Sequence, residues 1–562
     1  LGACNQGAKV ARGDYILFLN NDTQVGPGWL STLTGTASSV QKCGAVGAKL
    51  VLPDGTLQEA GSIIWSDATA SGYGRGESPL GPEYNYVREV QYCSGACLMV
   101  RRDLFERIGG FDKRYAPAYY EEADLCMEIT RLGYKVVYQP KVSVIHYEFG
   151  SSGRDSAVKL QAENRKKFAD KWKSELSTFA SPGEKGILKA RATGKSAGRV
   201  LFIEDRVPDP ALGAGYPRSY RMLTDIAALG YEVTCFPMLF SDRPAAVTTA
   251  LQQLGVEVFY GETDSKLSFE KFFKSRIGYY DIAFVCRPHN MKAVAGLCGT
   301  DAKLKIVYDA EAIFALRDIK RQELKGRNVD EKTKASMVRA EVELTTEADA
   351  VVTVSEREKK FFIEHGASNV FVAGHVVEPN PTPNGHEARK DLLFVGNLAD
   401  GSPNEDSVLY FAKEVFPRIL KSVDCRLHIV GPNATKAVLS LASESILIAG
   451  LVDDLYQYYN SCRLFLAPTR YGAGIPLKVY EASSYGLPSV VSPLIAEQLV
   501  WKEGSEVLVG ARAESFAEEV VKLYTDPALW DKIRAGCLEA VARDCGPDSF
   551  KSNLKSALNL PC

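Results

Sequence analysis

Short apolar runs of strand length recur along the chain and alternate with stretches that have helical periodicity. In the first part these runs lie near residues 15–19, 44–51, 90–100 and 135–145. This alternation predicts an α/β domain. A polar, basic stretch that begins near Lys159 predicts an amphipathic helix that closes the domain.

Two breaks in composition follow, and a new α/β pattern begins after each. Residues 181–198 are rich in Gly, Ser, Lys and Pro, which is typical of a linker. At Arg199 a strand, a glycine-containing loop, an amphipathic helix and a second strand predict the opening of a doubly wound sheet. A second linker-like stretch, residues 378–390, precedes another such opening. Further strand-like runs lie at 258–260, 281–286, 304–311, 350–355 and 369–374, and later within CRLHIVG, SILIAG, RLFLAP, PSVVSP and SEVLVG.

The chain is therefore predicted to be an α/β protein with two consecutive doubly wound halves behind a different α/β segment. Its length of 562 residues indicates three or four domains. The chain begins at Leu1, and the first strand expected of an α/β domain is missing, so we expect that it starts inside a domain. The predicted parts are a first domain (1–180), a linker (181–197), two doubly wound domains (198–380 and 388–545) and a C-terminal helix or tail (546–562).

Composition excludes several classes of protein. The net charge of −2 gives no excess of cations for nucleic acid. Thirteen cysteines without a CxxC pair favour buried thiols in a reducing compartment, and hence a cytoplasmic protein. No apolar run reaches the roughly 18 residues that a membrane-spanning helix needs.

The first candidate site begins at FLNNDT, where an apolar strand ends in Asn20 and Asp22. Ligands bind at the carboxyl ends of strands in α/β sheets, and these oxygen atoms suit Mg²⁺ or Mn²⁺ beside a phosphate. A turn after the strand is the simpler explanation. However, Glu121 and Glu122 lie at the start of a predicted helix, and His146 ends another apolar strand. Together these residues indicate a metal-and-base site.

These segments resemble the C-terminal two-thirds of a metal-dependent, inverting GT-A glycosyltransferase of family 2. LNNDT resembles the family's Asp-x-Asp motif, YYEEADLC its Glu-Asp-x-Asp motif, and YCSGACLMVRRDLFERIGGFD its acceptor-side segment. The resemblance implies that Asp22 and His146 hold the divalent ion and that Asn20 contacts the sugar nucleotide. It also implies that Glu122 deprotonates the acceptor hydroxyl, although the family usually has Asp there. The family's first βαβ unit, which binds the nucleobase, is expected to precede Leu1.

The second candidate site lies in the doubly wound halves. Gly213 and Gly215 follow the first strand of the first half, where backbone N–H groups can approach a phosphate. In the second half, APTRYGAGIPLKVYEASSYGLP places Gly474, Lys478 and Glu481 between two apolar strands. The alternative is a helix that simply packs on the sheet and carries exposed charges.

Residues 198–545 resemble a GT-B glycosyltransferase of family 4, which has two Rossmann-like domains. LLFVGNLADGSPNEDSVLYFAKEVFPRI and GLVDDLYQYYNSCRLFLAPTRYGAGIPLKVYEA resemble its C-terminal domain, and IVYDAEAIFALRD and ADAVVTVSEREKKFF resemble its N-terminal domain. The resemblance implies that Lys478 neutralises the donor diphosphate, that Glu481 binds the ribose, and that Gly396 lets its loop approach the donor. It implies no metal in this half.

This half departs from the family pattern at several positions. Ala473 stands where the family has Glu, and Asn397 and Ser402 stand where it often has Arg and Lys. We therefore expect the positive charge to come from Lys478 and Arg470. His289 follows a strand of the first half, and either an acceptor-binding role or a structural role would explain it.

The leading hypothesis is a bifunctional glycosyltransferase that moves a sugar from a nucleoside-diphosphate sugar to a glycan or lipid-linked glycan acceptor. It would act in bacterial surface polysaccharide synthesis, in the cytoplasm or peripherally at the inner face of the membrane. The first alternative is a nucleotide-sugar-binding scaffold whose GT-A half has lost its activity. The second is a sugar-nucleotide epimerase of the same two-Rossmann architecture.

Overall fold

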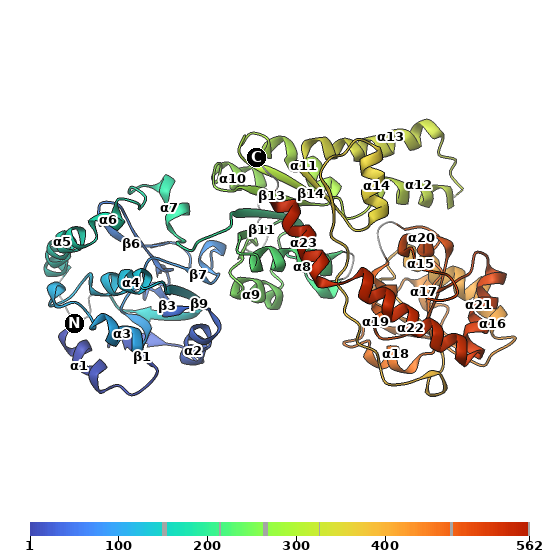
Figure 1. The fold of residues 1–562 in the computed structure, drawn as a ribbon, viewed down its shortest axis with the longest axis horizontal. Coiled ribbons are helices and arrows are strands. Elements are labelled where there is room, and N and C mark those ends of the chain that lie inside the picture. The colour runs from blue at the N-terminus through green and yellow to red at the C-terminus, as the bar shows by residue number, and fades with distance from the viewer. Residues whose placement is uncertain (149–153, 213–214, 262–267, 325, 473–475, 560–562) are drawn as a thin grey trace. The chain divides into compact units, whose positions relative to one another are not determined.

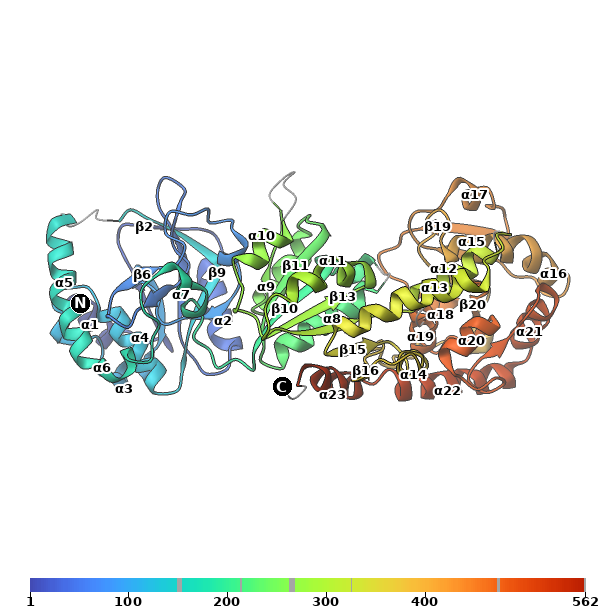
Figure 2. The same ribbon diagram turned by 90° about the horizontal axis from the view of Figure 1, so that it is seen from above.

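The computed structural model in Figures 1 and 2 forms two compact units. The first unit comprises Leu1–Val207, Ile226–Ala283 and Asp301–Leu304, and the second comprises Pro208–Asp225, Phe284–Thr300 and Lys305–Cys562. The structure describes residues 1–562 except 149–153, 213–214, 262–267, 325, 473–475 and 560–562.

The N-terminal α/β domain is built on a mixed sheet with the strand order β1-β8-β3-β9-β2, to which β4 and β7 add short pairings. Each predicted strand of this part is present, although the run predicted at 90–100 forms a strand only over its last residues. The elements are α1 (Gly2–Val10), β1 (Tyr15–Leu19), β2 (Thr23–Val25), α2 (Trp29–Ser39), β3 (Cys43–Val51), β4 (Leu57–Glu59), β5 (Ser62–Ile64), β6 (Ala70–Gly72), β7 (Arg88–Glu89), β8 (Cys97–Arg101), α3 (Arg102–Ile108), α4 (Glu121–Arg131), β9 (Lys135–His146), α5 (Arg154–Lys171), α6 (Lys173–Leu176) and α7 (Glu184–Ala190).

Helices cover both faces of this sheet, because successive residues of its central strand point to opposite sides. Val46 of β3 lies in one buried cluster with Leu33 of α2. Its neighbour Ala45 lies in the other cluster, with Ile129 of α4. Strand β1 is the edge of the sheet and pairs, among the described residues, only with β8.

The second sheet has the strand order β12-β11-β10-β13-β14-β15-β16. Its described pairings are parallel, as the βαβ pattern predicted. The elements are β10 (Arg199–Arg206), α8 (Tyr216–Ala228), β11 (Glu232–Phe240), α9 (Ala245–Gln253), β12 (Glu257–Val258), α10 (Phe269–Lys274), β13 (Ile282–Cys286), α11 (Pro288–Cys298), β14 (Lys305–Asp309), α12 (Phe314–Leu324), α13 (Glu331–Val342), β15 (Ala350–Thr353), α14 (Glu356–Glu364) and β16 (Val370–Val372).

The third sheet is parallel and has the order β19-β18-β17-β20-β21-β22. This is the strand order of a Rossmann fold, whose topological switch point lies between β17 and β20. The elements are β17 (Leu392–Val395), α15 (Pro403–Tyr410), α16 (Phe416–Ile419), β18 (Leu427–Val430), α17 (Lys436–Leu439), β19 (Ile446–Gly450), α18 (Tyr456–Ser461), β20 (Leu464–Ala467), α19 (Leu477–Ser484), β21 (Ser489–Val491), α20 (Pro493–Leu499), β22 (Leu508–Val509), α21 (Ala513–Thr525), α22 (Pro527–Asp544) and α23 (Pro547–Leu558).

One segment differs from what composition predicted. The predicted linker 181–197 contains helix α7 and the buried Arg191, which pairs with Glu257 at 2.7 Å. Arg276 pairs with the same carboxylate at 2.7 Å, so the segment is fixed within the first unit. The C-terminal segment, which was predicted to be a helix or a tail, forms helix α23, and the Asn553 side chain donates to the Val372 carbonyl of β16 at 2.9 Å.

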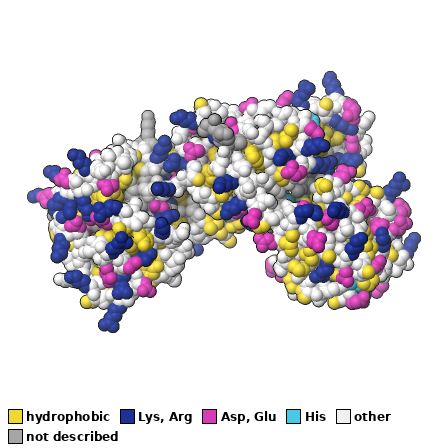
Figure 3. Space-filling view, viewed as in Figure 1, with side chains coloured by type: hydrophobic (Ala, Val, Ile, Leu, Met, Phe, Trp, Pro, Cys, Tyr) yellow, Lys and Arg dark blue, Asp and Glu magenta, His cyan; other side chains and the backbone are white. Residues whose placement is uncertain are grey.

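The charged side chains of the surface and the cysteines are distributed as the composition predicted. Figure 3 shows Lys and Arg interspersed with Asp and Glu over the face in view. The described cysteines are free thiols, and all of them except Cys4 are buried. Within the described ranges, no helix is long and apolar enough to cross a bilayer.

Candidate functional site

The end of β1 and the end of β9 bring the two predicted metal ligands together. Strand β2 pairs antiparallel with β9 so that Thr23 lies opposite His146. The Oδ1 atom of Asp22 consequently lies 3.4 Å from Nε2 of His146. The Asn20 amide nitrogen lies 3.5 Å from the same ring nitrogen. Three residues that the sequence singled out thus meet at one place.

The His146 ring is buried and is held by a residue that the sequence analysis missed. Its Nδ1 atom lies 2.9 Å from Oε1 of Gln58 in β4. If Nδ1–H donates to this oxygen, the Nε2 lone pair faces the Asp22 carboxylate. This is the orientation that second-sphere partners give to metal-binding histidines.

The residues at this place provide some, but not all, of the ligands that a divalent ion needs. Asp22 and His146 supply an oxygen and a nitrogen ligand. Over the described residues, no group of three or more His, Cys, Asp and Glu side chains is arranged to hold a metal. The pair would therefore hold an ion only together with oxygen atoms from a donor phosphate or water.

Glu121 and Glu122 are the first two residues of α4, and both carboxyl groups are largely withdrawn from water. Burial raises the pKa of Glu122, and burial together with the charge of Glu122 raises the pKa of Glu121 to about 8. The Oε2 atom of each is buried and has no hydrogen-bond partner among the described residues. Such unsatisfied, high-pKa carboxyl groups are candidates for proton transfer.

The backbone before this pair is strained. Tyr119 and Tyr120 both have φ of 75°, which is unfavourable for bulky side chains. The buried Asn164 of α5 holds this loop, because its side-chain amide donates to the carbonyls of Ala118 and Tyr119 at 2.9 and 3.1 Å. The same amide donates to the Tyr115 carbonyl at 2.9 Å. Nothing in the sequence pattern indicated this role for Asn164.

Two other acids complete the surroundings of this pair. Asp124, the last acid of the motif, accepts from Tyr115, Lys171 and Trp172 at 2.8 to 3.0 Å, so its role is structural. Glu59 of β4 is buried, and burial raises its pKa to about 7, with a contribution from the charge of Glu122. No signal in the sequence marks Glu59, because it lies in a short strand without a distinctive pattern.

The second candidate site lies at the switch point of the third sheet. Gly396 follows β17, and Thr469 to Gly472 follow β20, so both loops leave carboxyl ends of adjacent strands. Ligands bind at such a point in open α/β sheets. Helix α15 begins after the first loop and α19 after the second.

Lys478 is the second residue of α19, and its ammonium group contacts neutral groups in the described structure. The Nζ atom donates to Oδ1 of Asn404 at 2.8 Å and lies 4.4 Å from the centre of the Phe394 ring. Burial lowers the pKa of Lys478 to about 7. Among the described residues, no carboxylate forms an ion pair with it. A partly buried cation with only neutral partners is suited to bind an anion.

The neighbours of Lys478 explain the glycine after β17. Asn404, which accepts from Lys478, packs directly against Gly396. A side chain at position 396 would lie 2.7 Å from the Asn404 amide, so only glycine leaves room for Asn404 there. Glu481 lies one turn further along α19, and burial raises its pKa. The helical spacing of Lys478 and Glu481 agrees with the prediction.

Other predicted donor-binding residues are placed less favourably. Arg470 is exposed and forms a two-point ion pair with Asp406, with Nε 2.9 Å from Oδ2. Its charge is therefore already matched. Gly215 has φ of 90° and packs against the Glu311 carboxylate, which forms an ion pair with Arg287 at 3.2 Å. Gly213 and Gly474 lie outside the described residues.

His289 is the second residue of α11, and its side chain is exposed. Asp309, at the end of β14, accepts from both terminal nitrogens of the buried Arg218 at 2.7 and 2.9 Å. Asp309 is thus a structural partner of Arg218. The acceptor-binding role of His289 stays a prediction.

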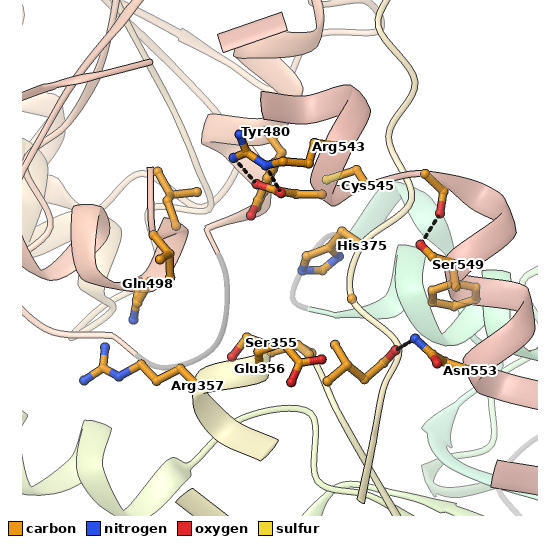
Figure 4. Close-up of a pocket in the computed structure, with 18 of the residues that line it drawn as sticks. Ser355, Glu356, Arg357, His375, Tyr480, Gln498, Arg543, Cys545, Ser549 and Asn553 are labelled. Atoms are coloured by element: carbon orange, nitrogen blue, oxygen red, sulfur yellow. Dashed lines mark hydrogen bonds and ion pairs between the residues drawn. The ribbon is translucent and has the colours of Figure 1, made fainter. Parts of the chain in front are cut away.

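One cavity in the second unit has a volume of about 670 Å³ and is shown in Figure 4. His375 and Gln498 point into it, and Arg543 at its wall is paired with Glu506 at 2.9 Å. Neither Lys478 nor Glu481 lines it. A smaller cavity of about 370 Å³ is lined by Arg470, Gly472 and Gln498, and so adjoins the loop after β20.

Comparison with known proteins identifies two segments. Residues 1–109 match the family described as glycosyl transferase family 2. Residues 389–526 match the family described as glycosyl transferases group 1. Two segments of the chain are thus similar to two glycosyltransferase families, and the predicted resemblance to a two-module glycosyltransferase is confirmed.

Curated relatives are similar over part of the chain. The "O-antigen biosynthesis protein RfbC" of Myxococcus xanthus is 35% identical over 159 residues, which are 27% of this chain and 12% of that protein. The "N-acetylglucosaminyl-diphospho-decaprenol L-rhamnosyltransferase" of Mycobacterium tuberculosis is 32% identical over 164 residues, 27% of this chain and 53% of that protein. The match thus spans about half or less of each relative's length.

Among solved structures, TarM is similar with a TM-score of 0.50 and 8% sequence identity. The match covers 65% of this chain and 99% of TarM. At this identity the likeness concerns the fold alone. It agrees with the strand orders of the second and third sheets, and the predicted fold class, a GT-A-like α/β domain followed by two Rossmann-like domains, is confirmed.

Proposed function

We propose that this protein transfers a sugar from a nucleoside-diphosphate sugar to a glycan or lipid-linked glycan acceptor. The observation that carries the proposal is the ammonium group of Lys478. It lies at the start of a helix beside the switch point, and its described partners are neutral. A diphosphate supplies the missing negative charge, and the helix start supplies N–H donors.

In this half the chain's own groups bind and orient the donor. Lys478 contacts the diphosphate, and charge accumulates there as the bond to the sugar breaks. Asn404 holds the ammonium group in place at 2.8 Å. Glu481, one turn further along α19, accepts a hydrogen bond from a ribose hydroxyl. Fixed positive charge at the departing group stabilises the transition state more than the ground state.

In the N-terminal α/β domain we assign proton transfer to Glu122. Its raised pKa makes it a stronger base than an exposed carboxylate once it is ionised. It takes the proton from the acceptor hydroxyl, and Asn164 keeps its helix in position through the loop before it. Glu121 shares the site, and the charge of Glu122 raises the pKa of Glu121 beyond the effect of burial. A divalent ion between Asp22 and His146 would neutralise the departing diphosphate.

The names of the relatives support a role in surface polysaccharide assembly. One relative is named for O-antigen biosynthesis and another for rhamnosyl transfer to a diphospho-decaprenol acceptor. We infer that this chain uses a related lipid-linked or glycan acceptor. A polyprenyl acceptor would place the protein in the cytoplasm, in peripheral contact with the inner face of the membrane.

The test is release of nucleoside diphosphate by the full chain from a panel of nucleoside-diphosphate sugars, with and without a lipid-linked acceptor. Lys478→Ala should lower the release from the donor of the second half by about 10- to 150-fold, because the lost contact is charge-assisted. Lys436→Ala, which changes an exposed lysine of α17, is the matched control and should leave release unchanged. Equal release by Lys478→Ala and wild type with every donor would contradict the proposal.

A further inference from the structure

The donor site of the second half has fewer cations than a diphosphate needs. Asn397 and Ser402 occupy the loop after β17, and the charge of Arg470 is matched by Asp406. Lys478 alone therefore faces a group that carries at least two negative charges. A second cation has to come from elsewhere in the chain.

Helix α12 brings an arginine to this loop. Gly401, in the loop between β17 and α15, has φ of 65°, and a side chain there would lie 2.6 Å from Nη2 of Arg321. The glycine thus gives the guanidinium group room beside the loop. Two bonds fix the loop at the same residue: Tyr471 donates to the Gly401 carbonyl at 2.9 Å, and the Gly401 N–H donates to Glu405 at 2.6 Å.

The Arg321 guanidinium has no anionic partner among the described residues. Its Nε atom is buried and lacks a hydrogen-bond partner in the described structure. The other bases of α12 are paired, Arg317 with Asp318 at 3.1 Å and Lys320 with Glu323 at 3.6 Å. Arg321 therefore differs from its helical neighbours.

Three acids lie in the loop or in the first turn of α15, and none forms an ion pair with Arg321 in the described structure. Asp400 is exposed, and the other two have partners of their own. Glu405 accepts from the Gly401 N–H and, through its other oxygen, from the Thr435 hydroxyl, each at 2.6 Å. Asp406 is held by Arg470. Leaving a guanidinium group partly buried and unpaired is unfavourable unless an anion binds there.

We propose that Arg321 is a second diphosphate-binding residue of the donor site. It approaches the loop before α15 from helix α12, whereas Lys478 reaches Asn404 of α15 from helix α19. Its planar guanidinium group binds phosphate oxygens through two parallel hydrogen bonds, and it takes the place of the basic residues that positions 397 and 402 lack. This inference rests on the proposed donor site and names a residue that neither the family pattern nor the sequence analysis indicated.

The experiment measures binding of UDP, GDP, dTDP and inorganic pyrophosphate to the full chain by calorimetry. Arg321→Ala should weaken binding of the preferred nucleotide and of pyrophosphate by at least about tenfold. It should also lessen the dependence of affinity on salt, because one cation is lost. Arg321→Lys should fall between wild type and Arg321→Ala, since a point charge cannot make the two-point contact. Arg317→Ala, on the same helix, is the control and should bind as wild type does.

Thermal unfolding of each variant separates loss of binding from loss of fold. If Arg321→Ala keeps the wild-type melting temperature and binds diphosphates as tightly as wild type, while Lys478→Ala does not, the assignment of Arg321 is wrong and the proposed donor site stands. If wild type binds none of these ligands, the donor site itself is refuted, and the role of Arg321 with it. If Arg321→Ala unfolds, the diphosphate affinity of the folded Arg321→Lys variant is compared with that of wild type instead. An equal affinity would then refute the assignment of Arg321.

Discussion

Binding of a diphosphate at Lys478 should depend on pH in a way that an ordinary lysine would not show. Burial lowers the pKa of Lys478 from 10.5 to about 7, and its contacts are the neutral Asn404 amide and the Phe394 ring. Only the protonated ammonium group attracts the diphosphate. Raising the pH from 7 to 9 therefore removes the charge that makes the contact.

The expected size of the effect follows from the titration. With a pKa of about 7, the protonated fraction falls from about one half at pH 7 to about one hundredth at pH 9. Affinity should fall about tenfold for each pH unit, until the whole contact is lost. A charge-assisted phosphate contact limits the total loss to about 1.5–3 kcal/mol.

The assay is calorimetric titration of the full chain with a nucleoside diphosphate at pH 7, 8 and 9, in buffers of different ionisation enthalpy. Above pH 7, binding should take up close to one proton, because the bound anion restores the charge on Lys478. Lys478→Arg keeps its charge throughout this range and should remove most of the pH dependence. If wild type and Lys478→Arg lose affinity with the same slope, Lys478 is not the titrating group and the reasoning is wrong.

Three further predictions test other parts of the structure. Asn164→Ala should lower the turnover of the N-terminal site by up to about 100-fold with little change in KM, because it releases the loop before Glu122. An unchanged turnover would show that the loop keeps its geometry without Asn164. Glu257→Gln should destabilise the first unit by about 3–5 kcal/mol in denaturant unfolding, since it leaves two buried arginines without their carboxylate, whereas Glu270→Gln, in an exposed pair, should have no measurable effect. Gly431→Ala should lower the free energy of unfolding, measured by thermal unfolding, by about 1–3 kcal/mol, because the new side chain would collide with the Gly396 carbonyl. Wild-type stability would mean that the backbones at positions 396 and 431 are not in close contact.

Local patterns in the sequence were sufficient to predict most of the strands. Apolar runs bounded by turns correspond to β17 to β22, and their alternation with helices accounts for the parallel order of the third sheet. Asp22 and His146 could also be singled out from the sequence, because Asp22 follows an apolar run closely and His146 ends one. Their separation of 3.4 Å depends on the pairing of β2 with β9, which no local pattern specifies.

The remaining features depend on contacts between residues that are distant in the sequence. Arg470 was expected to bind the donor, but Asp406, 64 residues away, matches its charge. The Gly- and Lys-rich segment after residue 180 was expected to be a linker, but Arg191 finds Glu257 66 residues further on. Asn164 reaches its loop from a helix more than forty residues away. Long-range partners of this kind leave no periodic signal in the sequence.

The central claim is that the full chain transfers sugars from nucleoside-diphosphate donors at two sites. The most direct measurement is the mass of a lipid-linked acceptor after incubation with the chain and matched donors, in wild type, in Lys478→Ala, in Glu122→Gln, and in Glu106→Gln as an exposed control. We expect wild type and Glu106→Gln to add two sugars, and we expect each site variant to add fewer. No mass increase with wild type and any donor, or two added sugars in both site variants, would contradict the account.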